Sequence, residues 1–250
     1  MTTSLAPEAL HPSLWRASQL ARATTRCVDT GHASLAVQLP GGGWPVGALI
    51  DLLVAQHGIG EMRLLGLALS SAAGRGIALV EPPHPPQILA LAALGVPASQ
   101  ATWIRSGRTA DALWATEQVL RSGTFGAVSF WQNHAHSESL RRLHLAAQQG
   151  DTLFFMLRPL AAAQDASPAA LRLSLRPAAE GIEIGFVKRR GPRRDDTLFL
   201  PMPLDLVGTP RTRRTPADRP ATVSSAAKPT IHTGVAHLQL APEFHAWVRA

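Results

Sequence analysis

The sequence predicts an α/β protein with a mostly parallel twisted sheet that is covered by helices on both faces. The first observation is Gly47–Val54, a nearly unbroken apolar run that is typical of central strands in parallel sheets. The second is the alternation of helical and strand patterns up to Thr152–Leu157, which predicts βαβ crossovers. The third is a change of pattern, because Leu171–Arg176 and Ile182–Lys188 alternate around a turn and predict a late antiparallel hairpin.

The elements between these landmarks are expected in a regular order. The predicted helices are Ala33–Leu39, Glu61–Ala73, Gln87–Leu94, Ala110–Arg121 and Ser137–Gln149. The further predicted strands are Gly76–Val80, Ala101–Ile104, Phe125–Trp131 and a short final Leu198–Leu200. Residues 40–45, rich in Pro and Gly, are expected to form a loop.

Three regions follow from these patterns. Residues 1–29 are interpreted as an N-terminal helical arm, 30–204 as the α/β domain, and 205–250 as a linker with a C-terminal tail. The linker is rich in Pro, Thr, Arg, Ser and Ala, but the tail becomes apolar again. Its apolar residues predict a partner-docking element, with packing on its own domain as the alternative: Leu240, Phe244, Trp247 and Val248.

Composition narrows the class of protein. Hydrophobic residues make up 46% of the 250 residues and charged residues 16%, which permits a sizeable core. No apolar run is long enough for a bilayer, no secretory signal pattern opens the chain, and Cys27 is the single cysteine. We therefore expect a cytoplasmic protein that does not associate with a membrane.

The net charge of +7 is unevenly placed. Residues 188–219 contain nine basic and four acidic residues. Such a stretch can attract DNA or an acidic partner surface, or it can serve only as a solvated tail. The candidate contact residues are Lys188, Arg189, Arg190, Arg193 and Arg194.

The strand–turn–helix around residues 47–73 has the layout of a phosphate-binding P-loop, G-x-x-x-x-G-K-[ST]. Placing Gly60 on the second glycine puts Ala55 on the first, Glu61 on the lysine and Met62 on the hydroxyl residue, with Gly58 inside the turn. An anion in place of the cation repels polyphosphate, so we expect a degenerate nucleotide site. The alternative is an ordinary turn in which Glu61 is a favourable acid in the first turn of the helix.

A longer comparison points to a family. Residues 30–65 resemble the opening of RecA-type ATPases, and residues 10 to 200 resemble the ImuA family of SOS mutagenesis proteins, sometimes grouped with SulA-like cell-division inhibitors. The matching pieces are LPGGGWPVGALIDLL, QHGIGEMRLL, DALWATEQVLRSGTFGAVSFW, LRRLHLAAQQGDTLFFMLRP, SPAALRLSLRP and VKRRGP. The resemblance implies a RecA-like fold. It also implies as partners an ImuB-like inactive Y-family polymerase and an error-prone C-family DNA polymerase, with RecA and DNA as further candidates.

The same resemblance assigns other positions. Glu81 falls near the catalytic carboxylate of RecA-like proteins, although a surface turn residue is the preferred interpretation, and Trp131 stands where the magnesium-side aspartate would be. Basic residues after the late hairpin, here from Lys188 onward, reach a neighbour's nucleotide in RecA-like filaments. With the P-loop degraded, phosphates of DNA or an acidic partner are their expected targets.

No other chemistry is predicted. His134, His136 and His144 lack the spacing of a metal site and are interpreted as polar loop histidines, and no G-x-S-x-G motif is present. We expect no cofactor, no metal and no catalysis. The expected function is a non-catalytic accessory role in SOS-induced error-prone translesion DNA synthesis. The alternatives are a residual nucleotide-binding ATPase that regulates recombination and a SulA-type cell-division inhibitor.

Overall fold

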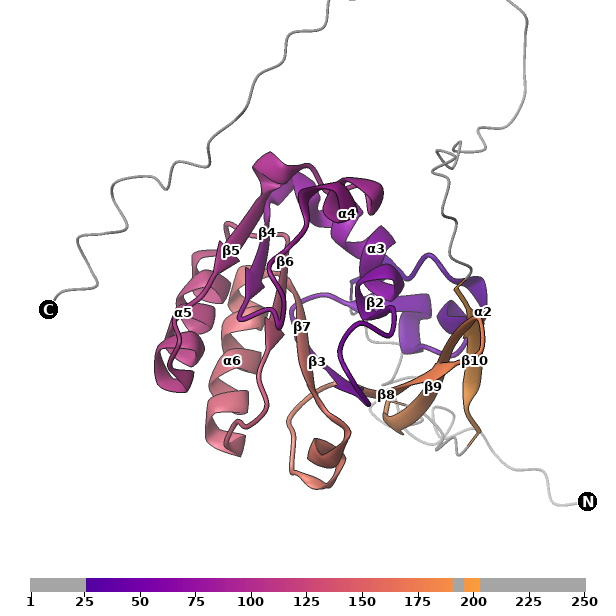
Figure 1. Cartoon of the computed structure of the whole chain (residues 1–250). Coiled ribbons are helices and arrows are strands. Elements are labelled where there is room, and N and C mark those ends of the chain that lie inside the picture. The colour runs from indigo at the N-terminus through magenta and orange to yellow at the C-terminus, as the bar shows by residue number, and fades with distance from the viewer. Residues whose placement is uncertain (1–25, 191–195, 203–250) are drawn as a thin grey trace, which may run out of the picture. The chain divides into compact units, whose positions relative to one another are not determined.

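A sheet of eight strands forms the centre of the protein in a computed structural model that describes residues 26–190 and 196–202 (Figure 1). Its strands are β3 (Ala48–Val54), β4 (Ile77–Val80), β5 (Ala101–Ile104), β6 (Ala127–Trp131), β7 (Leu153–Pro159), β8 (Leu171–Ala178), β9 (Gly181–Lys188) and β10 (Leu198–Pro201). The α-helices are α2 (Ala33–Ala36), α3 (Glu61–Ala72), α4 (Ile88–Ala93), α5 (Thr109–Ser122) and α6 (Ser137–Gly150). Short 3₁₀ turns are η2 (Pro40–Gly42), η3 (Ala73–Arg75), η4 (Ala98–Gln100) and η5 (Leu160–Gln164).

The strand order is β10-β9-β8-β3-β7-β6-β4-β5. The strands from β8 to β5 are parallel, and β9 and β10 are added as antiparallel strands. All seven residues of β3 are buried, as expected for a strand with a parallel neighbour on each side. The predicted α/β fold with a mostly parallel sheet and a late antiparallel hairpin is therefore confirmed.

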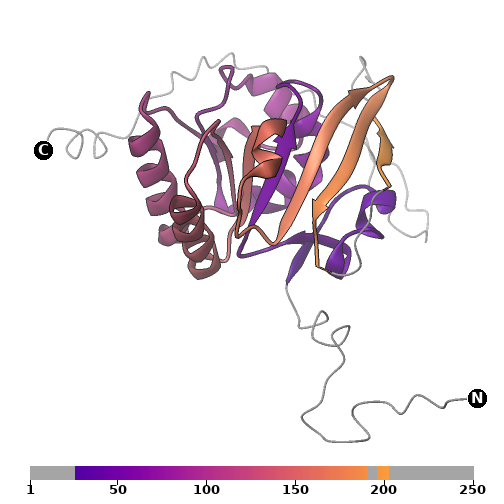
Figure 2. The same cartoon turned by 90° about the horizontal axis from the view of Figure 1, so that it is seen from below.

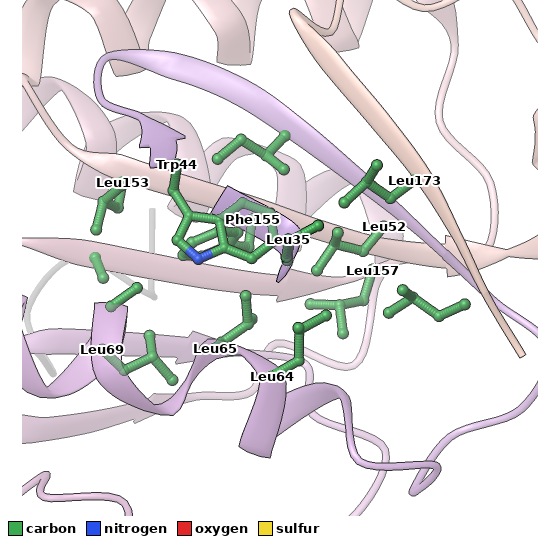
Figure 3. Packing of buried hydrophobic residues seen from close by; sticks show 14 of the residues in the cluster. Leu35, Trp44, Leu52, Leu64, Leu65, Leu69, Leu153, Phe155, Leu157 and Leu173 are labelled. Carbon is green, nitrogen blue, oxygen red and sulfur yellow. The ribbon is translucent and has the colours of Figure 1, made fainter. Parts of the chain in front are cut away.

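Helices cover both faces of the sheet (Figure 2). On one face, leucines of α3 pack against Leu52 of β3 and Leu157 of β7. Figure 3 shows Trp44 and Phe155 in this cluster, and their rings meet edge to face with centroids 5.4 Å apart. On the other face, α5 and α6 pack against β6 and β7. Apolar side chains on successive strand residues thus fill two separate cores.

The segment that precedes β3 differs from the prediction. The expected loop at residues 40–45 contains η2 and a strand, β2 (Gly43–Pro45), which pairs antiparallel with β1 (Cys27–Asp29). A Cβ atom at Gly43 would lie 2.3 Å from the Val28 carbonyl oxygen, so the two strands can approach only because residue 43 is glycine. The end of the predicted helical arm is therefore a strand. The rest of that arm, residues 1–25, lies outside the described residues.

A buried ionic cluster ties the central strands together. Asp51 of β3 accepts hydrogen bonds from Arg172 Nε (3.0 Å) and Arg158 Nη1 (3.4 Å), and both the aspartate and Arg158 are fully buried. Arg158 also pairs with the half-exposed Asp165 at 2.5 Å. Burial raises the pKa of Asp51, while the two guanidinium groups act in the opposite direction. The remaining donors of Arg172 bind carbonyl oxygens of η5 and of the residue after it. These bonds join η5 to the start of β8.

Replacement of Asp51 by Asn is expected to destabilise the fold by about 3–5 kcal/mol, because two buried guanidinium groups lose their shared counter-charge. Urea unfolding followed by circular dichroism measures this. The matched control is Asp165→Asn, which removes a partner whose side chain is 56% exposed and is expected to cost about 1 kcal/mol. Equal losses for the two variants would contradict the central role of Asp51.

Candidate functional site

The turn between β3 and α3 occupies the place where a P-loop would bind phosphate. Gly58 and Gly60 have φ angles of 84° and 110°, in the left-handed region that favours glycine. Gly60 caps α3, and Ala55 N–H donates to the Leu175 carbonyl of β8 at 3.0 Å. The turn therefore contains two left-handed glycines, and the N–H of Ala55 is already bound within the sheet.

The carboxylate of Glu61 fills the turn. Its Oε1 accepts a hydrogen bond from Gly58 N–H at 2.9 Å, and its Oε2 accepts one from Gly60 N–H at 3.2 Å. The residue is only 4% exposed. Glycine N–H groups of such turns are the donors that hold phosphate in nucleotide-binding proteins. Glu61 therefore does more than repel phosphate, because its own oxygens take the donors that phosphate would need.

Apolar side chains occupy two other positions of the P-loop alignment made from the sequence. Met62 is half-buried and packs against the α3-side core. Trp131, at the end of β6, is 6% exposed and belongs to the same core cluster. The structure thus places these two side chains in apolar packing, where a P-loop ATPase needs a hydroxyl and a carboxylate for magnesium.

Met202, the residue after β10, packs against the turn between β3 and α3. A Cβ atom at Gly60 would lie 3.1 Å from the sulfur of Met202, which is 7% exposed. Arg63 Nη1 donates to the Met202 carbonyl at 3.1 Å, and Met202 N–H donates to the Glu180 carbonyl at 2.8 Å. The β8–β9 turn, β10 and the turn between β3 and α3 are therefore held together.

Glu81 organises a second loop at the same edge of the sheet. Its Oε1 accepts hydrogen bonds from Ser106 Oγ (2.7 Å) and Gly107 N–H (3.2 Å), and also from Ser106 N–H. Burial acts to raise the pKa of Glu81, but these bonds and the charge of Arg105 outweigh it and hold the pKa below its usual range. Glu81 is thus a turn residue that orders its neighbour loop.

The basic run lies at the other edge of the sheet. By strand register, Lys188 stands opposite Arg172, which stands opposite Asp51 near the middle of β3. β8 is parallel to β3 and β9 is antiparallel to β8. The chain at the end of β9 therefore runs away from the turn between β3 and α3. Lys188 Nζ donates to the Ser167 carbonyl at 3.1 Å.

Arg189 Nη1 donates to the Gln38 carbonyl at 2.6 Å, and its guanidinium lies 5.7 Å from the centre of the Phe186 ring. Arg193 and Arg194 lie outside the described residues.

The histidines form no metal site in the described part of the chain, where no group of three His, Cys, Asp or Glu side chains could hold an ion. The interpretation of His144 as a loop histidine is wrong, since it lies within α6 and its Nδ1 accepts a hydrogen bond from Leu49 N–H at 3.1 Å. Burial lowers the pKa of His144, and the charges of Lys188 and Arg190 lower it further. The neutral imidazole therefore fastens α6 to the start of β3.

The tail residues Leu240, Phe244, Trp247 and Val248 fall outside the described residues, so their docking role stays a prediction. Among residues 26–190 and 196–202, no helix is long and apolar enough to cross a bilayer.

Comparison with known proteins gives one partial similarity. No protein-family model matches the chain. Over 76 residues, which are 30% of this chain, it is 34% identical to the cell division inhibitor SulA of Edwardsiella piscicida. The match spans 45% of the length of SulA, which is less than half of that protein.

The purified chain is expected to bind Mg-ATP too weakly for detection at micromolar concentration and to leave it unhydrolysed. The turn lacks the P-loop lysine and hydroxyl, and two of its N–H groups are already bound to Glu61. Isothermal titration calorimetry and a phosphate-release assay measure binding and turnover. The matched control is Glu61→Arg, which removes the internal anion. Micromolar affinity with turnover above that control would overturn the assignment of Glu61.

Acid is expected to weaken the fold partly through Glu81. A carboxylate whose folded-state pKa is lowered stabilises the fold above its unfolded value, near 4.3, and that contribution is lost as pH falls through the folded value. Glu81→Gln should therefore flatten the decline of unfolding free energy between about pH 5 and pH 3. Urea titrations across this range test it, with the exposed Glu138→Gln as control. Parallel pH curves for the wild type and Glu81→Gln would contradict it.

Proposed function

We propose that this chain is a non-catalytic accessory protein of SOS-induced, error-prone translesion DNA synthesis. In this proposal it binds an ImuB-like inactive Y-family polymerase and works with an error-prone C-family DNA polymerase, and RecA and DNA are further contacts. The observation that carries the proposal is the occupation of the Gly58 and Gly60 N–H groups by Glu61.

A protein whose phosphate donors are bound by its own carboxylate has to act through its surfaces. The apolar packing of Met62 and Trp131 supports the same view, because neither side chain can hold a metal-bound phosphate. The partial similarity to SulA supports a place among the SulA-like proteins with which the ImuA family is sometimes grouped. Folds of this kind host many functions, so the partner has to be established by binding.

Co-purification with a Y-family-polymerase-like partner tests the proposal. The full chain is expected to retain the partner without nucleotide, and Mg-ATP should leave the retained amount unchanged, because the turn cannot change state with ATP. A chain that lacks residues 235–250 tests the predicted docking tail in the same assay. Binding that requires ATP, or no binding by the full chain, would contradict the proposal.

The similarity to SulA favours a second candidate, inhibition of cell division. The two candidates differ in their effect on cells. If expression of the chain makes cells filamentous and leaves damage-induced mutation unchanged, the second candidate is favoured and the polymerase accessory role is contradicted.

A further inference from the structure

The run Lys188–Arg190 is divided by the fold into two sides. β9 ends at Lys188, so strand alternation does not extend over the rest of the run, and the contacts place its residues. Arg189 reaches the Gln38 carbonyl beside α2, whereas Lys188 reaches the Ser167 carbonyl in the segment between η5 and β8. Figures 1 and 2 show α2 and α6 on opposite sides of the β8–β9 hairpin.

Arg189 acts as an anchor for the chain that leaves β9. Its guanidinium donates to Gln38 at 2.6 Å and lies against the Phe186 ring, and its Nε is buried. An arginine that is fixed by a carbonyl and an aromatic face contributes to packing. It is therefore the member of the run least able to reach another molecule.

Lys188 and Arg190 belong to a positive patch on the α6 side. Lys188 stands opposite Arg172, whose guanidinium binds Asp51, and Asp51 shares the α6-side face of β3 with Leu49. Arg190 follows two residues later, and the charges of Lys188 and Arg190 both lower the pKa of His144. Arg141 is exposed and lies one turn earlier on α6, on the same side as His144. The α6-side patch is defined here as Arg141, His144, Lys188 and Arg190.

The nearby acids leave this patch with an excess of positive charge. Asp165 is paired with Arg158, so its charge is already matched within the cluster around Asp51. Asp196, which precedes β10, is an exposed acid at the same end of the hairpin, and the exposed Glu138 lies one turn before Arg141 on α6. The three cationic side chains of the patch outnumber these two exposed carboxylates. The bond to Ser167 uses one hydrogen of the Lys188 ammonium and leaves two donors for a ligand.

We propose that the α6-side patch contacts the phosphate backbone of duplex DNA, with Lys188 and Arg190 as the contacting residues, whereas Arg189 packs within the protein and takes no part in the contact. The patch has no aromatic side chain free to stack on bases, because the imidazole of His144 is bound to Leu49. Single-strand binding normally uses such stacking, whereas duplex binding without sequence preference needs only cations placed on phosphates. The inference rests on the proposed function in one respect, since it takes DNA as the polyanion.

The experiment measures binding of the full chain to a fluorescent 30-base-pair duplex by anisotropy over a range of salt concentrations. The double variant Lys188→Ala with Arg190→Ala is expected to weaken binding roughly ten-fold and to lower the slope of log affinity against log salt by about 2, since each phosphate contact contributes about 0.9. The matched control is Arg189→Ala. It is expected to keep the salt slope and to lower the melting temperature, because it loses the contacts to Gln38 and Phe186.

Three results with the variants would overturn the proposal. The first is an unchanged salt slope in the double variant. The second is an equal loss of DNA binding in a fully folded Arg189→Ala control. The third is loss of the polymerase-like partner by the double variant while DNA binding is unchanged, which would show an acidic protein surface as the ligand. If the wild-type chain does not bind duplex DNA at low salt, the DNA contact is wrong. Partner co-purification then still decides the proposed function separately.

Discussion

The two hydrogen bonds from Gly58 and Gly60 to the carboxylate of Glu61 fix the turn between β3 and α3. A turn with left-handed glycines and a following helix presents donors to any anion that reaches it. Here the anion is part of the chain and is almost fully buried. Since a tethered carboxylate is always present at its site, a free phosphate competes at a disadvantage, and Met202 packs against the same turn.

The same kind of contact occurs after β4, where the carboxylate of Glu81 binds the backbone of residues 106–107. In parallel α/β sheets, ligands bind at the carboxyl ends of the strands. Two loops at this edge instead hold internal carboxylates. The buried cluster around Asp51 joins β3, β7 and β8, so internal ionic bonds also hold the central strands together.

The sequence was sufficient to predict most elements of the sheet, because buried parallel strands are continuous apolar runs and the helices between them are amphipathic. It was insufficient for β2, whose Gly43 and Pro45 have the composition of a loop. That strand exists because Gly43 permits close approach to Val28, which no local pattern reveals. The bond from His144 to Leu49 spans 95 residues and is equally hidden from local reasoning.

The candidate site, like the fold, could be predicted from the sequence only in part. The sequence predicts either that Glu61 repels phosphate or that it is a favourable acid in the first turn of the helix. It does not predict the bonds of Glu61 to Gly58 and Gly60, because the direction of a side chain depends on the turn that holds it. The sequence presents residues 188–190 as one basic block, whereas Lys188 and Arg189 bind carbonyl groups of different segments, Ser167 and Gln38. Charge along a chain therefore specifies how much cation is available, and the tertiary contacts at the end of the strand decide which side of the protein receives it.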